Sequence, residues 1–242
     1  MTARMTVDFL YPGHAAEDDY PRMQRMLSDS VRLAVEHTYG EDLHAVDALL
    51  ELGSTARLAE GVTRLARHDP DAVVWACTSG SFVFGPEGAA EQVAKLSEAA
   101  GVPASSTSFA FARAAKSLGL RTVAVAASYP AEVAERFVSF LAAEGLAVAG
   151  LSSEGIVTAA EVGQLPAESV LRLARAHDHP DADALLIPDT AMRTVALIEK
   201  IEAELGKPVL TANQVTLWEG LRLVDAMRPV PGLGALFAGG RE

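Results

Sequence analysis

Two stretches, DAVVWACTSGS (residues 71–81) and DADALLIPDTAMRT (residues 181–194), decide the fold. Each has an acidic lead-in, a short apolar strand and a threonine-bearing turn into a helix. After that helix, each half continues with a Gly-x-Pro start of another strand. The strands TVDFLYPG, from Thr6, and TVAVAASYP, from Thr122, also both run into Tyr-Pro. The chain therefore contains two similar halves.

Apolar runs rich in Val, Leu and Ile alternate with segments of helical period along the chain. This pattern predicts an α/β fold in which helices cover parallel sheets. The expected strands are 6–10, 43–48, 72–76, 122–126, 146–151, 184–187 and 208–211. The expected helices are 20–37, 54–68, 88–100, 109–118, 131–144, 166–176, 193–205 and 214–227.

The two halves predict two quasi-symmetric lobes with a cleft between them. Matching the strand ends sets Cys77 opposite Asp189. We expect lobe one to comprise residues 1–113 and 214–242, and lobe two to comprise residues 114–213. The last helix would then return to pack on lobe one.

The chain of 242 residues carries 20 Lys and Arg against 32 Asp and Glu, a net charge of 20 − 32 = −12. An acidic surface repels phosphate backbones, so nucleic acid is not an expected partner. No stretch reaches the roughly 18 to 20 apolar residues of a membrane helix, and the N-terminus lacks the apolar core of a secretory signal. The single cysteine excludes internal disulfides and paired-cysteine zinc motifs. We therefore expect a cytoplasmic protein without membrane contact.

Ligands of parallel α/β sheets bind outside the carboxyl ends of the strands. Cys77 and Asp189 both lie at such ends, so two facing lobes would present them from opposite walls of one cleft. The small residues of CTSGS offer N–H groups that favour anions and lower a thiol pKa, which makes Thr78 and Ser79 candidates for substrate contact. The alternatives are a buried, inert Cys77 followed by an ordinary turn and helix cap.

His14, in the exit of the first strand (YPGHAAEDDYP), is expected on the rim of the cleft. There it would make a polar contact or donate a proton, and the alternative is an exposed loop histidine. The segment HDHPDAD (177–183) has two histidines but no second ligand cluster, so no metal site is assigned.

Four segments carry a resemblance to a known family: VVWACTSGSF (73–82), TVAVAASYPAEV (122–133), PDTAMRT (188–194) and PVLTANQVTLWEGLR (208–222). Together they resemble the maleate isomerase group of the Asp/Glu racemase superfamily, which also includes arylmalonate decarboxylases. The resemblance implies an enzyme that needs no cofactor and has two flavodoxin-like lobes with the active site in the cleft between them. It also implies a small carboxylic acid as substrate and a homodimer or higher homo-oligomer.

By this resemblance, Cys77 is the nucleophile that adds to the double bond of a cis-diacid, allows rotation and is then expelled. Tyr129 matches a tyrosine that contacts substrate. Thr78 and Ser79 match the loop that holds a carboxylate, and Thr190 matches the corresponding loop of the second lobe.

Two departures from the family pattern affect the substrate. Asp189 stands where isomerases and racemases carry a second cysteine. The only asparagine of the chain is Asn213, so the asparagines with which isomerases grip both carboxylates are missing, and Ala159 stands in one of their positions. From its residue type, Asp189 is a general acid, a base in proton transfer, or only a helix N-cap.

We therefore expect a cysteine enzyme, with Cys77 and Asp189 as catalytic residues, that acts on a small carboxylic acid. Maleate-type cis–trans isomerisation is favoured, because a first-lobe cysteine suits addition to an alkene. Decarboxylation of a substituted malonate and racemisation of a small amino or hydroxy acid stay open. A non-catalytic carboxylate-binding protein and a purely structural dimerising protein are further alternatives.

Overall fold

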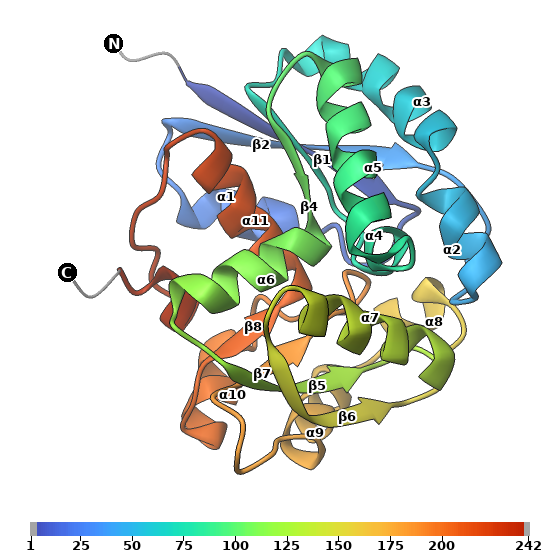
Figure 1. The fold of residues 1–242 in the computed structure, drawn as a ribbon. Helices are drawn as coiled ribbons and strands as arrows, with labels where there is room; N and C mark the ends of the chain where they lie inside the picture. Colours follow the sequence, from blue (N-terminus) through green and yellow to red (C-terminus); the bar gives the residue numbers. More distant parts are fainter. Residues whose placement is uncertain (1–3, 240–242) are drawn as a thin grey trace.

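Two parallel sheets of four strands each organise the computed structural model, which describes residues 4–239 (Figure 1). The first sheet has the order β2-β1-β3-β4, formed by β1 (Met5–Pro12), β2 (Val31–Thr38), β3 (Ala72–Trp75) and β4 (Ala104–Ser106). The second has the order β6-β5-β7-β8, formed by β5 (Thr122–Ala127), β6 (Ala147–Ser153), β7 (Ala184–Ile187) and β8 (Val209–Thr211). The repeated order confirms the predicted α/β class with two flavodoxin-like lobes.

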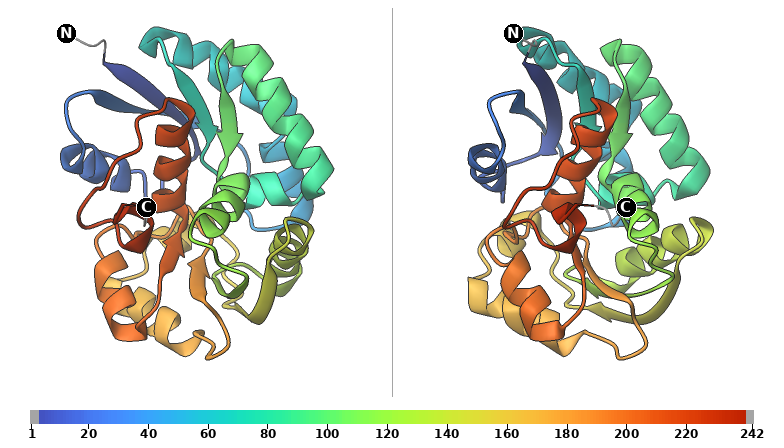
Figure 2. Two further views of the ribbon diagram at one scale, coloured as in Figure 1. Left: turned by 60° about the vertical axis from the view of Figure 1, so that its left-hand side comes forward. Right: turned by 90° about the vertical axis from the view of Figure 1, so that its left-hand side faces the viewer.

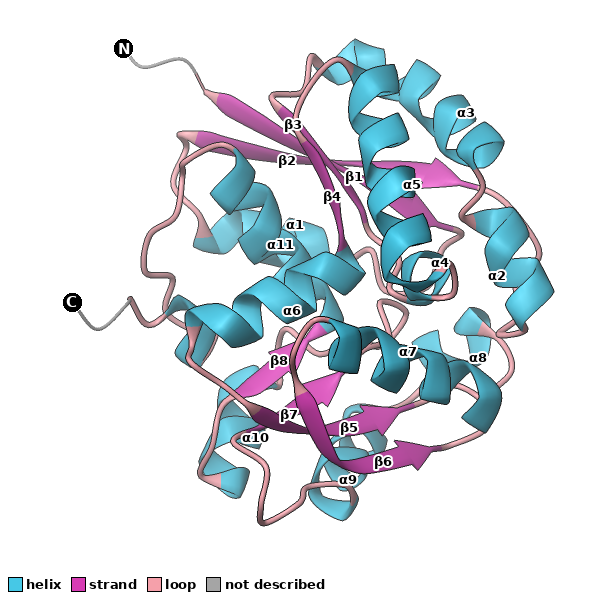
Figure 3. Cartoon of the chain, in the orientation of Figure 1, coloured by secondary structure: helices cyan, strands magenta, loops and turns pink. Residues whose placement is uncertain are grey.

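Helices cover the sheets and fill the space between them (Figure 3). They are α1 (Asp19–Met26), α2 (Val46–Leu52), α3 (Thr55–Leu65), α4 (Ser79–Phe82), α5 (Gly85–Ala100), α6 (Thr107–Ser117), α7 (Ala131–Ala143), α8 (Ala159–Gly163), α9 (Ala167–Ala176), α10 (Ile198–Leu205) and α11 (Ala212–Leu223). The 3-10 turns are Ala66–His68 and Ala235–Phe237. Within residues 4–239, no helix has the length and apolar character to cross a membrane.

The first sheet is covered on both faces. Helices α3 and α5 pack on one side, while α1 and α11 pack on the other (Figure 2). Helix α11 follows the last strand of the second sheet, yet it contacts β1, β3 and β4 of the first sheet. The chain thus returns to the first sheet at its C-terminal end.

The aspartates that precede β3 and β7, Asp71 and Asp183, have the same structural role in both halves. Asp71 accepts a hydrogen bond from the backbone N–H of Thr6, at 2.7 Å, which fixes the start of β3 beside the start of β1. Asp183 accepts one from the N–H of Thr122, at 2.9 Å, and does the same for β7 and β5. The two halves therefore share a contact as well as a sequence pattern.

The second strand of the first sheet contradicts the prediction from sequence. The expected helix over 20–37 ends at Met26, and Val31–Thr38 forms β2. The expected strand over 43–48 is instead a loop followed by the start of α2. From Ala34 to Thr38 the side chains alternate between more and less buried positions, which is the period of a strand. That short alternation was masked by the helical pattern before it.

Smaller differences concern short elements and helix ends. The short helices α4 and α8 were not expected, whereas β4 follows the Gly-x-Pro start at residues 101–103 that the repeat predicts. Helix α10 begins at Ile198 instead of residue 193, because the segment before it forms turns. Helix α11 begins at Ala212, where Thr211 and Gln214 form a reciprocal capping box.

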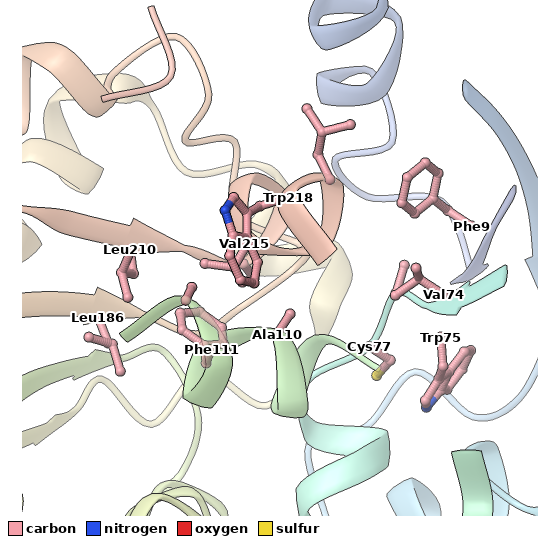
Figure 4. Close-up of a cluster of buried hydrophobic side chains, with 14 of the residues drawn as sticks. Phe9, Val74, Trp75, Cys77, Ala110, Phe111, Leu186, Leu210, Val215 and Trp218 are labelled. Atoms are coloured by element: carbon pink, nitrogen blue, oxygen red, sulfur yellow. The ribbon is translucent and has the colours of Figure 1, made fainter. Parts of the chain in front are cut away.

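A continuous apolar core joins the two sheets. Figure 4 shows Phe9, Val74 and Trp75 of the first sheet in one cluster with Phe111 of α6, Val215 and Trp218 of α11, and Leu186 and Leu210 of the second sheet. Cys77 lies at the border of this cluster, just past the end of β3.

The division into lobes at 113/114 and 213/214 stays a prediction. The first boundary falls within α6 and the second near the start of α11. Residues 1–3 and 240–242 of the predicted lobe one lie outside the described residues.

Candidate active site

A cavity of about 230 Å³ lies where loops of the two sheets meet. The first sheet contributes the segments that follow β1, β2 and β3, and the second contributes the segment after β7 and the start of α8. Parallel strands bring the loops at their carboxyl ends to one edge of a sheet. The cavity therefore occupies the cleft that the sequence predicts.

The structure brings the predicted site residues together. The cavity is lined by His14, Cys77, Ser79, Asp189 and Thr190. The two other predicted residues, Thr78 and Tyr129, are buried. The Tyr129 hydroxyl lies close enough to Cys77 and Asp189 for their negative charges to raise its pKa, although burial is the larger cause.

The thiol of Cys77 is 3% exposed and faces the loop that follows it. The backbone N–H of Gly80 donates to its Sγ at 3.2 Å, and the Ser79 hydroxyl lies at 3.8 Å. Burial nevertheless raises the pKa of the Cys77 thiol to about 11. The donors of the loop lower the thiol pKa, as the sequence predicts, but desolvation outweighs them, so the net shift is upward. The thiol is protonated at neutral pH.

The carboxylate of Asp189 is buried opposite the first-sheet wall of the cavity. The backbone N–H of Ala191 donates to Oδ1 at 2.8 Å, and the Ser128 hydroxyl donates to Oδ2. No helix follows directly, since α10 begins only at Ile198, so the helix N-cap interpretation is wrong. Two hydrogen-bond donors of the second sheet therefore fix the position of the Asp189 carboxylate at the cavity.

Thr78 and Tyr129 supply hydroxyls next to the cysteine. The Thr78 hydroxyl is buried and has no hydrogen-bond partner among the described residues. The Tyr129 hydroxyl donates to the carbonyl of Pro188 at 2.8 Å. Neither Thr78 nor Tyr129 is among the residues that line the cavity.

Thr190 is fixed by contacts between the two halves. Its carbonyl accepts a hydrogen bond from the Tyr11 hydroxyl at 2.8 Å and one from Asn213 Nδ2 at 3.1 Å. Tyr11 and Asn213 come from β1 and α11, so the second-sheet turn is held by elements that pack with the first sheet.

His14 lies on the rim of the cavity, as the sequence predicts, and its side chain is 58% exposed. Its Nδ1 lies 3.2 Å from Glu17, and its ring stacks on that of His37 at 3.9 Å. Potential metal-ligating atoms of these three residues lie within 4.8 Å of one another, the one such group within residues 4–239.

Sequence reasoning missed the loop between β2 and α2. His44 of this loop is buried, lines the cavity, and places its Nε2 4.0 Å from Asp189 Oδ2. Asp42 accepts hydrogen bonds from the N–H groups of Ala159 and Ala160 at 2.7 and 3.1 Å. The signal that would have found the loop is its position after the carboxyl end of β2, which the wrong helix assignment hid.

Two facing lobes with a cysteine and a carboxylate at one shared cavity define a two-lobed α/β protein with an interlobe cysteine site. Comparison of sequences then gives the family. The profile of the arylmalonate decarboxylase family matches residues 31–237, and the chain belongs to this family.

Curated relatives include both activities of the group. An arylmalonate decarboxylase from Bordetella bronchiseptica is 30% identical over 194 residues, 79% of this chain and 79% of that protein. A maleate isomerase from Nocardia farcinica is 30% identical over 209 residues, 83% of this chain and 82% of that protein.

Solved structures show the same fold. A structure of the maleate isomerase Iso from Pseudomonas putida with maleate has a TM-score of 0.90 and 19% identity, covering 97% of this chain and 98% of that chain. A Nocardia farcinica maleate cis–trans isomerase with a covalently bound succinylcysteine intermediate has a TM-score of 0.86 and 24% identity, covering 98% and 99%.

Proposed function

We propose that this protein is a cofactor-independent cysteine enzyme that converts maleate, or a closely similar cis-unsaturated acid, into the trans isomer. The observation that carries the proposal is the joint presence of Cys77 and Asp189 on one buried cavity between the lobes. The maleate isomerase of Nocardia farcinica, 30% identical over 83% of this chain, supports the same activity.

The proposed reaction starts with the thiol proton of Cys77. This proton passes to the Asp189 carboxylate while the sulfur forms a bond to one alkene carbon. The electron pair of the double bond moves to the neighbouring carbon, which takes the proton from Asp189. The product of these steps is a succinyl thioether, the kind of adduct named for the structure of the Nocardia isomerase.

Rotation about the new carbon–carbon single bond then turns the adduct from the cis to the trans arrangement. Asp189 removes the proton again, the double bond re-forms and the sulfur leaves. The thiol regains its proton from Asp189, so no external reductant, oxidant or cofactor is needed. Cys77 acts as nucleophile and leaving group, and Asp189 moves the proton.

The carboxylate of the substrate is held by the residues around the cysteine. We assign this role to the hydroxyls of Thr78 and Ser79, with the turn at Thr190 on the other side. Tyr129 joins them only if its hydroxyl turns from the Pro188 carbonyl to the substrate. The orphaned, buried hydroxyl of Thr78 supports the assignment, since a carboxylate oxygen would accept its hydrogen bond. His14 on the rim is assigned a contact with the entering acid.

A second candidate is the decarboxylation of a substituted malonate. Leu43, Leu49 and Leu52 give the cavity an apolar wall that suits an aryl or alkyl substituent. The arylmalonate decarboxylase of Bordetella bronchiseptica, 30% identical over 79% of the chain, supports this candidate.

The test is proton NMR in deuterated water with the wild type and Cys77→Ala. Maleate is offered first, then phenylmalonate, then small amino and hydroxy acids. Fumarate formed by the wild type and not by Cys77→Ala supports isomerisation. Loss of carbon dioxide supports the decarboxylase, and deuterium at the alpha carbon supports a racemase.

A wild type that turns over none of these acids would refute the proposal in favour of a carboxylate-binding protein. Thermal unfolding of Cys77→Ala is the control that the variant is folded. The cytoplasmic location and the homodimer stay predictions, and light scattering of the purified protein tests the second.

A further inference from the structure

The side chains around the cavity carry negative charge, which would repel a dicarboxylic substrate. Three acidic residues line it, namely Glu41, Asp42 and Asp189, and none of its described lining residues is Lys or Arg. Maleate would bring two more negative charges into this space. A buried charge requires a partner of opposite sign or hydrogen bonds, so a further cation or hydrogen-bond donor is needed at the cavity wall.

Only two lining side chains can become cations, His14 and His44. His14 is 58% exposed and its Nδ1 already faces Glu17 at 3.2 Å. The side chain of His44 is 6% exposed, and its nearest acidic partner is Asp189, with 4.0 Å between Nε2 and Oδ2. Since an interaction is screened less when it is buried, His44 is the stronger anion-binding group.

The ring of His44 is held so that one nitrogen faces the cavity. Its Nδ1 hydrogen-bonds the carbonyl of Ile156 at 3.0 Å, which requires the proton on Nδ1. The backbone N–H of His44 donates to the carbonyl of Val157 at 2.7 Å. The imidazole packs nearly perpendicular to the ring of Tyr129, with the ring centroids 5.0 Å apart. Nε2 makes no hydrogen bond with the described residues and is the nitrogen that can bind a ligand.

These contacts come from the second lobe, while His44 follows β2 of the first sheet. Asp42, two residues earlier, binds the N–H groups of Ala159 and Ala160. Its carboxylate is therefore occupied by two donors and is directed to α8. The loop therefore places His44 at the cavity, while the carboxylate of Asp42 binds α8.

We propose that His44 is a substrate-binding residue that selects dicarboxylates. In its protonated form, Nε2–H donates to the second carboxylate, while Thr78 and Ser79 hold the first. This inference rests on the proposed function in taking the ligand to be a small carboxylic acid, and it replaces the missing asparagines by a residue that the sequence did not reveal.

Isothermal titration calorimetry with unreactive ligands tests the role of His44 directly. Succinate has two carboxylates, and butyrate is an acid of the same chain length with one. We expect the wild type to bind succinate about 10- to 100-fold more tightly than butyrate, the range of a hydrogen bond between charged groups. His44→Asn should lose this preference, with butyrate affinity changed less than about threefold.

Asparagine is the informative substitution, because its amide nitrogen lies near the place of Nδ1 and can still donate to Ile156. His44→Gln places an amide donor closer to Nε2 and should keep an intermediate preference, so it serves as the second variant if His44→Asn does not fold. His14→Asn tests the other histidine of the cavity and should reduce the succinate preference less than His44→Asn does. His177→Asn, whose side chain does not line the cavity and pairs with Glu154, is the control and should leave the preference intact.

The proposal is overturned if the wild type fails to prefer succinate, if the folded His44 variants keep the full preference, or if His14→Asn has the larger effect. Fumarate formation by the same wild-type sample separates the two proposals. A His44-dependent preference without fumarate refutes the isomerase and supports the role of His44. Fumarate formation without a His44-dependent preference supports the isomerase and refutes the role of His44.

Discussion

The side-chain amide of Asn213 donates a hydrogen bond to Oδ2 of Asp19 at 3.1 Å, joining the first turn of α11 to that of α1. The same Asp19 oxygen accepts the backbone N–H groups of Thr194 and Val195, at 3.3 and 3.5 Å. One buried carboxylate therefore ties the turn after Asp189 to two helices that cover the first sheet.

Asp19 should make the protein less stable as the pH rises. Burial raises its pKa above the value of 3.8 of an exposed aspartate, despite the donors around it. The folded state then holds the proton more tightly than the unfolded state. The stabilisation is complete below pH 3.8 and is lost as the pH rises through the folded-state pKa.

Unfolding in urea at a series of pH values measures this effect. The free energy of unfolding of the wild type, minus that of Asp19→Asn, should fall from pH 4 to pH 7. Asp29→Asn, at an exposed position outside the groups that act on Asp19, is the control for the loss of one negative charge. A difference that rises with pH would contradict the role given to burial.

The rate at which Cys77 is alkylated should follow its high pKa. A thiol with a pKa of about 11 has little thiolate at pH 7, and its thiolate fraction grows about tenfold per pH unit up to pH 10. The rate of iodoacetamide adduct formation, followed by mass spectrometry, reports this directly, because Cys77 is the only cysteine. Cys77→Ser should give no thiol adduct. A rate that levels off below pH 9 would mean that the thiol is not desolvated.

Removing the charge of Asp189 should affect turnover more than folding. In Asp189→Asn the amide oxygen can still accept the N–H of Ala191, but the side chain can no longer take the thiol proton. We expect maleate turnover to fall about 100- to 10,000-fold. Asp183→Asn weakens a structural contact of the second sheet and should keep its turnover if it folds. Less than a tenfold loss in Asp189→Asn would assign the proton transfer to another group.

The contact of Asp42 with α8 should limit the opening of the cavity. Asp42→Ala removes the acceptor of two backbone N–H groups, at Ala159 and Ala160. Hydrogen exchange of residues 156–160 should accelerate about tenfold or more, since each bond is worth about 0.5–1.5 kcal/mol. Glu41→Ala, the neighbouring lining residue, should leave this exchange unchanged. Equal exchange in both variants would show that the contact does not hold the loop.

The sequence repeat correctly predicted the two similar sheets because part of it encodes the same hydrogen bond in both halves. Asp71 and Asp183 each anchor the start of a third strand to the first strand of the same sheet. Strand ends also placed Cys77 and Asp189 correctly, since parallel strands leave their carboxyl ends at a common edge. These features depend on short-range pattern and on general geometry, and both are visible in a single sequence.

The site was less predictable where it depends on tertiary contacts. His44 was missed because the misassigned β2 removed its loop from the cleft. The high pKa of the Cys77 thiol depends on how deeply the core buries it, which the loop sequence does not reveal. The contact of Asn213 with Asp19 joins residues 194 positions apart, so no local sequence pattern predicts it.

The late position of α11 has a consequence for biosynthesis. The strands of the second sheet, residues 122–211, emerge from the ribosome as one uninterrupted segment, whereas the first sheet lacks its α11 cover until residues 212–223 have followed (Figure 1). The first sheet is therefore translated first, but its helical cover is completed last. A nascent chain that stalls before Ala212 would leave this apolar sheet face covered only by α1, and the exposed part is a target for chaperones and a nucleus for aggregation.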